Sequence, residues 1–226
     1  MTDYIQYFGN LTTEICLDGV ISIFDINTKP KLYSEQRLVP CKLDVDSVKK
    51  CDFVFSTDER EECCEPESIE KIVNRTYAYF IAPSSAIERV PNIPKKFKID
   101  VKEGERFSLK NIDIGVTKTS QPRAVYSVGF ILKSKKHSVF FAGQTYTFTS
   151  ISTIKAEIAI LPIKGTQMMD YFDALESIKQ MRPKLAIPIA YENNPDGLSD
   201  LKEFVNKCPE YTKPVVLKPG QLLKLP

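Results

Sequence analysis

The feature that most constrains the fold is a pattern of strands and helices that occurs twice, once in each half of the 226-residue chain. The first half opens with strand-like segments at 5–9, 12–17 and 20–26, and Asp18-Gly19 is a hairpin signal between the last two. The second half has a similar hairpin, VYSVGFIL and VFFAGQT, around the turn KSKKHS. Antiparallel strands joined to β-α-β units in each half predict two mixed sheets packed together, with helices outside.

The helices are indicated by the spacing of apolar residues. After the apolar run at 53–55, Pro66 suits the first turn of a helix whose Ile69, Ile72 and Val73 share one face. Further helices are expected at 169–183 and 197–208, with strands at 156–163 and 184–191. The final segment, PVVLKPGQLLKLP, predicts two short strands around a Pro-Gly turn. No low-complexity linker divides the chain, so we expect one domain covering 1–226.

Composition excludes several classes of protein. Thirty-one basic and 29 acidic residues give a net charge of +2, which is too balanced to indicate a nucleic-acid groove. No apolar stretch reaches the roughly 18 residues that a membrane span needs, and the N-terminus lacks a signal-peptide pattern, so we expect a cytoplasmic protein that does not bind membranes. The six scattered cysteines are expected to be thiols.

Histidine is scarcer still, because His137 is the only one in the chain. Any mechanism that requires several imidazoles is therefore excluded. His137 falls in the predicted hairpin turn KSKKHS, where we expect it to be exposed.

The order of the segments resembles the metallo-β-lactamase superfamily, in particular its small cytosolic branch related to L-ascorbate-6-phosphate lactonase and other metal-dependent hydrolases. The resemblance covers nearly the whole chain and implies a four-layer αββα sandwich, an α+β or α/β arrangement of two mixed sheets flanked by helices. It also implies loops that hold one or two divalent ions, which convert water into hydroxide. Homologues of this branch often self-associate, which makes a homo-oligomer an expectation. The segments that carry the resemblance are IQYFGNLTTEICLDGVISIFDI, PESIEKI, VGFIL, VFFAGQT, AEIAILPIKG, KLAIPIAY and VVLKPGQ.

The family's first metal loop has the pattern T-H-x-H-x-D-H. With Ser56 at the position of the threonine, the three histidines fall on Thr57, Glu59 and Glu62, and the aspartate falls on Glu61. The framework of the loop is therefore kept, but none of its histidines is present.

The other expected ligands are also replaced. A histidine before the VGF strand would lie near Ser120 or Gln121, both poor ligands, and the bridging aspartate of the family's G-D-T loop is Gln144. The last histidine is Ala190, whose methyl group has no lone pair. Because zinc prefers nitrogen and sulfur donors, the resemblance implies that the dinuclear site has been lost and that no cofactor is bound.

Two alternatives keep some chemistry in the acidic loop. Glu59, Glu61 and Glu62 could form an oxygen site for Mg²⁺, Mn²⁺ or Ca²⁺, or they could be a solvated loop partly neutralised by Arg60. A nucleophilic cysteine at 63 or 64 is disfavoured, because the adjacent carboxylates raise a thiol pKa.

Three further residues lie at positions that border the family's site. Asp25 matches a family position. It would either position the residues that line the site, without being a ligand itself, or be an ordinary turn or cap residue. Lys164 and Tyr191 could hold an anion or a polar ligand, or be ordinary rim residues. Two functions follow: a non-catalytic binding or scaffolding protein with a protein partner or small ligand, or a hydrolase of a small phosphorylated or ester-like substrate that uses a carboxylate metal site or no metal.

Overall fold

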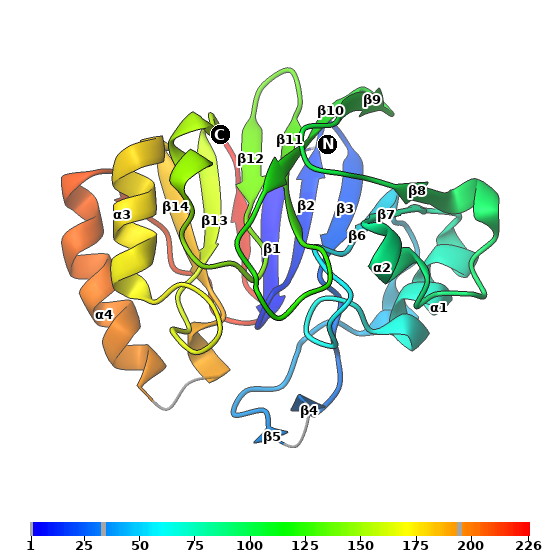
Figure 1. Ribbon diagram of the computed structural model, residues 1–226, viewed down its shortest axis with the longest axis horizontal. Helices are drawn as coiled ribbons and strands as arrows, with labels where there is room; N and C mark the ends of the chain where they lie inside the picture. The colour runs from blue at the N-terminus through cyan, green and yellow to red at the C-terminus, as the bar shows by residue number, and fades with distance from the viewer. Residues whose placement is uncertain (1, 33–34, 194–195) are drawn as a thin grey trace.

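The computed structural model describes residues 2–32, 35–193 and 196–226, and its centre is formed by two seven-stranded sheets (Figure 1). In the first sheet, β16, β1, β2 and β3 are antiparallel neighbours, and β3, β6, β7 and β8 are parallel neighbours. Its strands are β1 (Tyr4–Gly9), β2 (Thr12–Leu17), β3 (Val20–Phe24), β6 (Phe53–Phe55), β7 (Tyr79–Ala82), β8 (Lys98–Asp100) and β16 (Leu222–Lys224).

The second sheet has the same division into a parallel and an antiparallel part. From β15 through β14 and β13 to β12 the pairs are parallel, and from β12 through β11 and β10 to β9 they are antiparallel. A small separate pair is formed by β4 (Lys31–Leu32) and β5 (Glu35–Gln36). The strands of the second sheet are β9 (Arg106–Leu109), β10 (Ile112–Lys118), β11 (Val128–Lys133), β12 (Ser138–Phe141), β13 (Ile158–Pro162), β14 (Leu185–Ile189) and β15 (Lys213–Pro214).

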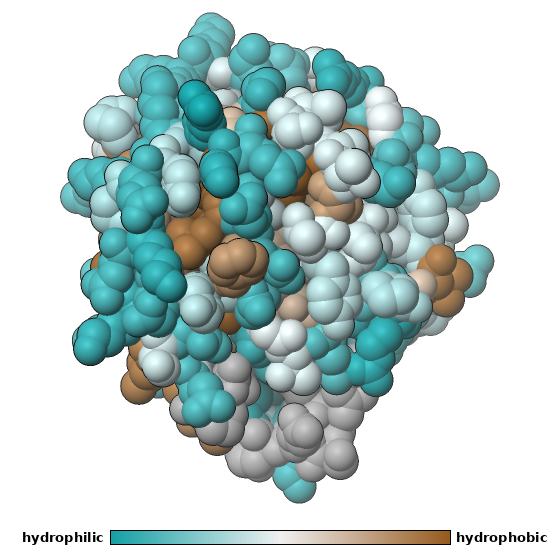
Figure 2. Space-filling view, turned by 60° about the vertical axis from the view of Figure 1, so that its left-hand side comes forward, coloured by the Kyte–Doolittle hydropathy of each residue, from teal (hydrophilic) through white to brown (hydrophobic). Residues whose placement is uncertain are grey.

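Helices cover the outer faces of both sheets, which confirms the predicted αββα sandwich. Figure 1 shows α1 (Pro66–Thr76) and α2 (Ser84–Ile87) on one side and α3 (Tyr171–Met181) and α4 (Gly197–Lys207) on the other. The side that carries α3 and α4 is mostly hydrophilic, with small separate hydrophobic patches (Figure 2). Short 3₁₀ turns lie at Val45–Ser47, Lys95–Phe97, Thr149–Thr153, Tyr191–Asn193 and Cys208–Glu210.

Helix α1 shows why the apolar spacing was informative. Pro66 occupies its first turn, where no backbone donor is needed, and the chain leaves the helix at Tyr77 in a left-handed conformation. Ile69, Ile72 and Val73 are buried in the core between α1 and the outer face of the first sheet.

Four phenylalanines join the two sheets beneath the loops described below. Phe24 stacks on Phe55 with ring centroids 4.5 Å apart, and it lies 4.6 Å from Phe141 of the other sheet. Phe55 in turn lies 4.7 Å from Phe130. Complete burial of such a ring contributes about 1.5–3 kcal/mol, so this cluster fixes the relative position of the strand ends above it.

The predicted C-terminal hairpin is wrong. Strand β15 pairs with β14 in the second sheet, whereas β16 pairs with β1 in the first. Gly220 lies in a turn at φ +92°, and its backbone N–H donates to Tyr7 O at 2.7 Å. The edge of β1 thus offers backbone partners to the last strand, which joins that edge instead of folding back on its neighbour.

Two other expectations concern the chain as a whole. All six cysteines are free thiols, as predicted. In the described ranges, no helix combines the length and the apolar character that crossing a bilayer requires.

Candidate functional site

The loops that follow the parallel strands of both sheets meet along one edge, the lower one in Figure 1. Asp25 follows β3 and Thr57 comes shortly after β6, both in the first sheet. Gln144, Lys164 and Ala190 follow β12, β13 and β14 of the second sheet. The carboxyl ends of parallel strands are where α/β proteins bind ligands, so this edge is the candidate site.

Asp25 holds the loop that follows β6. Both of its carboxylate oxygens accept hydrogen bonds from Thr57, one from the backbone N–H and one from the hydroxyl, each at 2.8 Å. Complete burial raises the pKa of Asp25 well above its ordinary value, although the bonds from Thr57 act in the opposite direction. Thr57 also touches the other sheet, because a Cβ on Gly143 would lie 2.5 Å from the Thr57 hydroxyl oxygen.

A buried ion pair lies next in this loop. Arg60 donates to Asp58 through Nη2 at 2.6 Å and through Nε at 3.2 Å, and its backbone N–H donates to Asp58 Oδ1 at 2.8 Å. The side chain of Asp58 has no exposed surface, and that of Arg60 is 9% exposed. Burial raises the pKa of Asp58, and the guanidinium partly offsets this rise. The pair therefore places a permanent cation inside the site.

Two more contacts connect the loop with the second sheet. Glu62, which is buried, has its Oε1 atom 3.8 Å from Lys164 Nζ. Cys63 is fully buried, and its Sγ lies 4.0 Å from Gln144 Oε1. Burial, followed by the neighbouring carboxylate of Asp25, raises the pKa of Cys63 well above that of a free thiol, so the thiol form is favoured.

The three glutamates suggested by the sequence point to different neighbours. Glu59 accepts hydrogen bonds from the Ser85 hydroxyl at 2.9 Å and from the Val125 backbone at 2.7 Å. Glu61 pairs with Lys29 at 3.2 Å, and only Glu62 turns into the site. Within the ranges that the structure describes, no group of three or more His, Cys, Asp or Glu side chains could hold a metal ion.

Ala190 lies in a buried network of polar groups. Its backbone, in the left-handed region at φ 65°, donates to the Tyr7 hydroxyl at 3.0 Å. That hydroxyl donates to Glu192 at 2.7 Å, and Glu192 also accepts from the backbone of Asn10. Burial raises the pKa of Glu192.

Ser120 and Gln121 act as supports for the Gln144 loop. The backbone N–H of Ser120 donates to the Thr145 hydroxyl at 2.8 Å. The side-chain amide of Gln121 donates to the backbone oxygens of Gln144 at 3.1 Å and Gln167 at 2.9 Å.

Two residues discussed from the sequence have their polar atoms engaged elsewhere. The Tyr191 hydroxyl donates to Leu217 O at 2.9 Å. His137 lies in the turn between β11 and β12, with Nε2 at 3.0 Å from Pro226 O and Nδ1 at 3.8 Å from Glu157. The turn was predicted correctly, but the expected exposure was wrong, because these contacts leave the His137 side chain only 12% exposed.

Four buried polar residues of the site carry no recognisable signal in the sequence. Arg37 donates through Nη2 to Asn27 Oδ1 at 3.1 Å, and the Asn27 amide donates to the backbone oxygen of Glu61. Asn10 and Glu192 are joined as described above. Arg37, Asn27 and Glu192 stand outside the quoted motifs, and nothing in the first quoted segment marks Asn10 as a site residue. Only the packing of distant loops brings these residues together.

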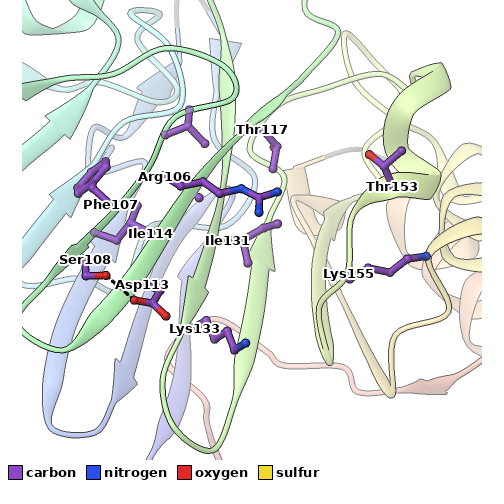
Figure 3. Close-up of a pocket in the computed structure, with 12 residues that line it drawn as sticks. Arg106, Phe107, Ser108, Asp113, Ile114, Thr117, Ile131, Lys133, Thr153 and Lys155 are labelled. Carbon is purple, nitrogen blue, oxygen red and sulfur yellow. Dashed lines mark hydrogen bonds between the residues drawn. The ribbon is translucent and has the colours of Figure 1, made fainter.

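A separate hollow of about 560 Å³ lies on the outer face of β9, β10 and β11 (Figure 3). Gly115 lacks a side chain there, and Arg106, Lys133 and Lys155 border the space. Ser108 donates to Asp113 at 2.5 Å across its floor. Thr153 and Lys155 come from the connection between β12 and β13 that also carries Gln144, but none of the site residues described above lines the hollow.

Solved structures with a similar fold include two hydrolases. Igni18, a metallo hydrolase from Ignicoccus hospitalis, superposes with a TM-score of 0.82 at 24% identity, over 100% of this chain and 99% of that one. An isothiocyanate hydrolase from Delia radicum gut bacteria gives a TM-score of 0.80 at 14% identity, over 98% and 99% of the two chains. At these identities the likeness shows the fold alone.

Sequence relatives are described as metal-dependent hydrolases. One from Staphylothermus marinus is 28% identical over 240 aligned positions, which cover 98% of this chain and 99% of the relative. One from Pyrococcus abyssi is 31% identical over 102 positions, so the match spans 43% of this chain and less than half, 45%, of that relative. The family model described as "Beta-lactamase superfamily domain" matches residues 4–190. The chain therefore belongs to the beta-lactamase superfamily.

Proposed function

We propose that this chain is a non-catalytic member of the superfamily that binds a ligand without a metal at the edge where its hydrolase relatives hold their ions. The observation that carries the proposal is the buried Asp58–Arg60 pair, with 2.6 Å between Oδ2 and Nη2. A guanidinium has five donors and no acceptor, so it cannot be a metal ligand. Its charge also repels a divalent cation placed beside it.

The directions in which the loop's side chains point indicate that the metal-loop pattern should be aligned one residue later in the sequence. We infer that its threonine corresponds to Thr57 rather than Ser56, since Thr57 is the residue that bonds Asp25 and contacts the Gly143 loop. The ligand positions then fall on buried residues, and Glu59 and Glu61, which face other neighbours, fall on the variable positions. The residues at the ligand positions become Asp58, Arg60, Glu62 and Cys63.

In this register the donor set does not fit a dinuclear centre. Both Asp58 oxygens are engaged by Arg60, Gln144 is a neutral amide and Ala190 has no donor atom in its side chain. Glu62 and Cys63 alone would leave two ligands from adjacent residues, whereas a structural zinc site takes four and a catalytic site usually three from the protein. We therefore assign no hydrolytic step to a metal here.

A thermal melt tests the proposal against the alternative of a carboxylate metal site. An ion bound at 100 times its Kd would stabilise the fold by about 2.7 kcal/mol, which gives a clear rise in melting temperature. We expect the same melting temperature in a chelator and in excess Mn²⁺ or Zn²⁺. A rise that disappears in Glu62→Gln but persists in the matched Glu61→Gln variant would refute the metal-free site.

A further inference from the structure

Buried polar atoms without a partner gather at the candidate site. In the described ranges, ten buried side-chain nitrogen or oxygen atoms have no hydrogen-bond partner, and seven of these belong to five residues of the site. Each such atom costs about 1–3 kcal/mol, and native proteins leave few of them unpaired. Their concentration at one edge indicates that a binding partner belongs there. The atoms are Asn10 Nδ2 and Oδ1, Arg37 Nε and Nη1, Arg60 Nη1, Glu62 Oε2 and Gln144 Nε2.

The strongest of these groups are guanidinium donors. Arg37 is 6% exposed and uses Nη2 on Asn27, while Nε and Nη1 have no partner in the described residues. Arg60 uses Nε and Nη2 on Asp58, and within the same ranges Nη1 has none. Three charged nitrogens thus remain, and charge-assisted bonds to carboxylate or phosphate oxygens are among the strongest that such groups form.

Contacts connect Arg37, Arg60 and the Gln144 amide through the short loop segment at 60–63. Arg37 bonds Asn27, whose amide donates to the backbone oxygen of Glu61, so Arg37 lies against the loop that carries Arg60. Gln144 meets the same loop from the second sheet at the Cys63 sulfur, 4.0 Å from its amide oxygen.

The unpaired donors favour an anion over a neutral ligand. Arg37 and Arg60 are buried, and Arg37 Nε and Nη1 and Arg60 Nη1 have no acceptor among the described residues. A carboxylate or phosphate group offers several oxygen acceptors and a negative charge, so it pairs with these charged nitrogens more strongly than a neutral group does.

We propose that Arg37, Arg60 and Gln144 bind the carboxylate or phosphate group of a small molecule. The Asn10 amide and the second oxygen of Glu62 remain for the hydroxyl or amide groups of the same ligand. The inference deepens the proposed function and rests on it, because the anion takes the place that metal ions occupy in hydrolase relatives. No covalent step is involved.

Calorimetric titration with inorganic phosphate and with malonate, in chloride buffer at constant ionic strength, tests this site on the full chain. We expect one or both anions to bind, and Arg37→Gln and Arg60→Gln each to weaken that binding at least tenfold. The matched control Arg106→Gln removes an arginine from the outer hollow and should bind as the unchanged protein does. A response to phosphate alone indicates a phosphorylated ligand, and a response to malonate alone indicates a carboxylate ligand.

Two outcomes would overturn the inference: no binding of either anion, or equal binding by Arg37→Gln. Circular dichroism verifies that each variant is folded, and Gln144→Ala replaces Arg60→Gln if the latter is not. The metal content of the same samples separates the two proposals. Metal-free protein that binds no anion contradicts only the anion site, whereas stoichiometric metal contradicts the proposed function itself.

Discussion

Arg60 Nη2 lies 2.6 Å from Asp58 Oδ2 in a loop where both side chains are buried. The two residues stand two positions apart, and the backbone N–H of Arg60 also donates to Asp58, so the pair is a compact local unit. The pair therefore places a fixed positive charge at this edge. In superfamily relatives described as metal-dependent hydrolases, bound metal ions would supply the positive charge there.

Removal of the cation should strongly destabilise the fold. In Arg60→Met the carboxylate of Asp58 stays buried without its partner, and breaking a buried pair in this way costs about 3–5 kcal/mol. The double variant Asp58→Asn/Arg60→Met should recover a large part of that loss. Urea unfolding measures both.

The exposed pair of Lys184 and Glu157, also 2.6 Å apart, is the control for this experiment. Lys184→Met should cost less than about 1 kcal/mol, because exposed ion pairs contribute little. An Arg60→Met variant as stable as Lys184→Met would show that the pair is not buried in solution.

Asp25 should make stability depend on pH. Its folded-state pKa is raised by burial, so the folded protein binds this proton more tightly than the unfolded chain does. The resulting stabilisation is complete below about pH 4, the ordinary Asp value, and is lost as pH rises through the folded-state pKa. The stability advantage over Asp25→Asn should therefore shrink as the pH rises from about 4 through neutrality.

Urea unfolding of both proteins across that range measures the trend, with Asp113→Asn as a control for the loss of one surface charge. An advantage that stays constant, or that grows with pH, would contradict a protonated Asp25 in the folded state.

Gly143 should not tolerate a side chain. A Cβ there would lie 2.5–2.7 Å from three atoms of Thr57, and the backbone has φ +66°. Gly143→Ala should cost about 2–4 kcal/mol, combining the positive-φ penalty with displacement of a buried neighbour. Gly104 has φ +89° but open space around it, so Gly104→Ala isolates the backbone effect of about 1 kcal/mol. Equal losses in the two variants, measured by thermal unfolding, would mean that the Thr57 contact is absent.

The thiols of the loop should be unreactive in the native protein. Burial raises the pKa of Cys64 to about 12 and that of Cys63 well above its ordinary value, so little reactive thiolate exists at either position. With a colourimetric disulfide reagent at about pH 8, near the ordinary thiol pKa, Cys63 and Cys64 should react only after unfolding. Rapid labelling of either cysteine, located by peptide mass spectrometry, would show that the loop opens.

Much of the fold could be predicted from the sequence because strand alternation and helical spacing are local. The meander of β1, β2 and β3, helix α1 and the order of strands in the second half all have such local signals. The pairing of β16 with β1 in the first sheet has no local signal, because it depends on the free edge of a strand at the other end of the chain.

The site could be located but not assembled from the sequence. Strand ends and the loop pattern indicated the region of the candidate site, and the sequence itself places Gln144 and Ala190 where the family pattern has metal ligands. The direction of alternate side chains in the acidic loop could not be read from the sequence. Glu59 and Glu61 therefore stood out by charge, Arg60 was expected to neutralise the glutamates, and its buried pairing with Asp58 was not predicted. The signal that could have found them is Thr57, which fits the pattern's threonine as well as Ser56 does.

The metal content of the purified protein tests the central claim most directly. The protein is dialysed against Mn²⁺ or Zn²⁺, freed of excess ion by gel filtration and measured by plasma mass spectrometry beside a Glu62→Gln/Cys63→Ser variant. We predict that both contain only traces of metal, far below one ion per chain. One or two ions per chain in the unchanged protein, lost in the variant, would contradict a metal-free site.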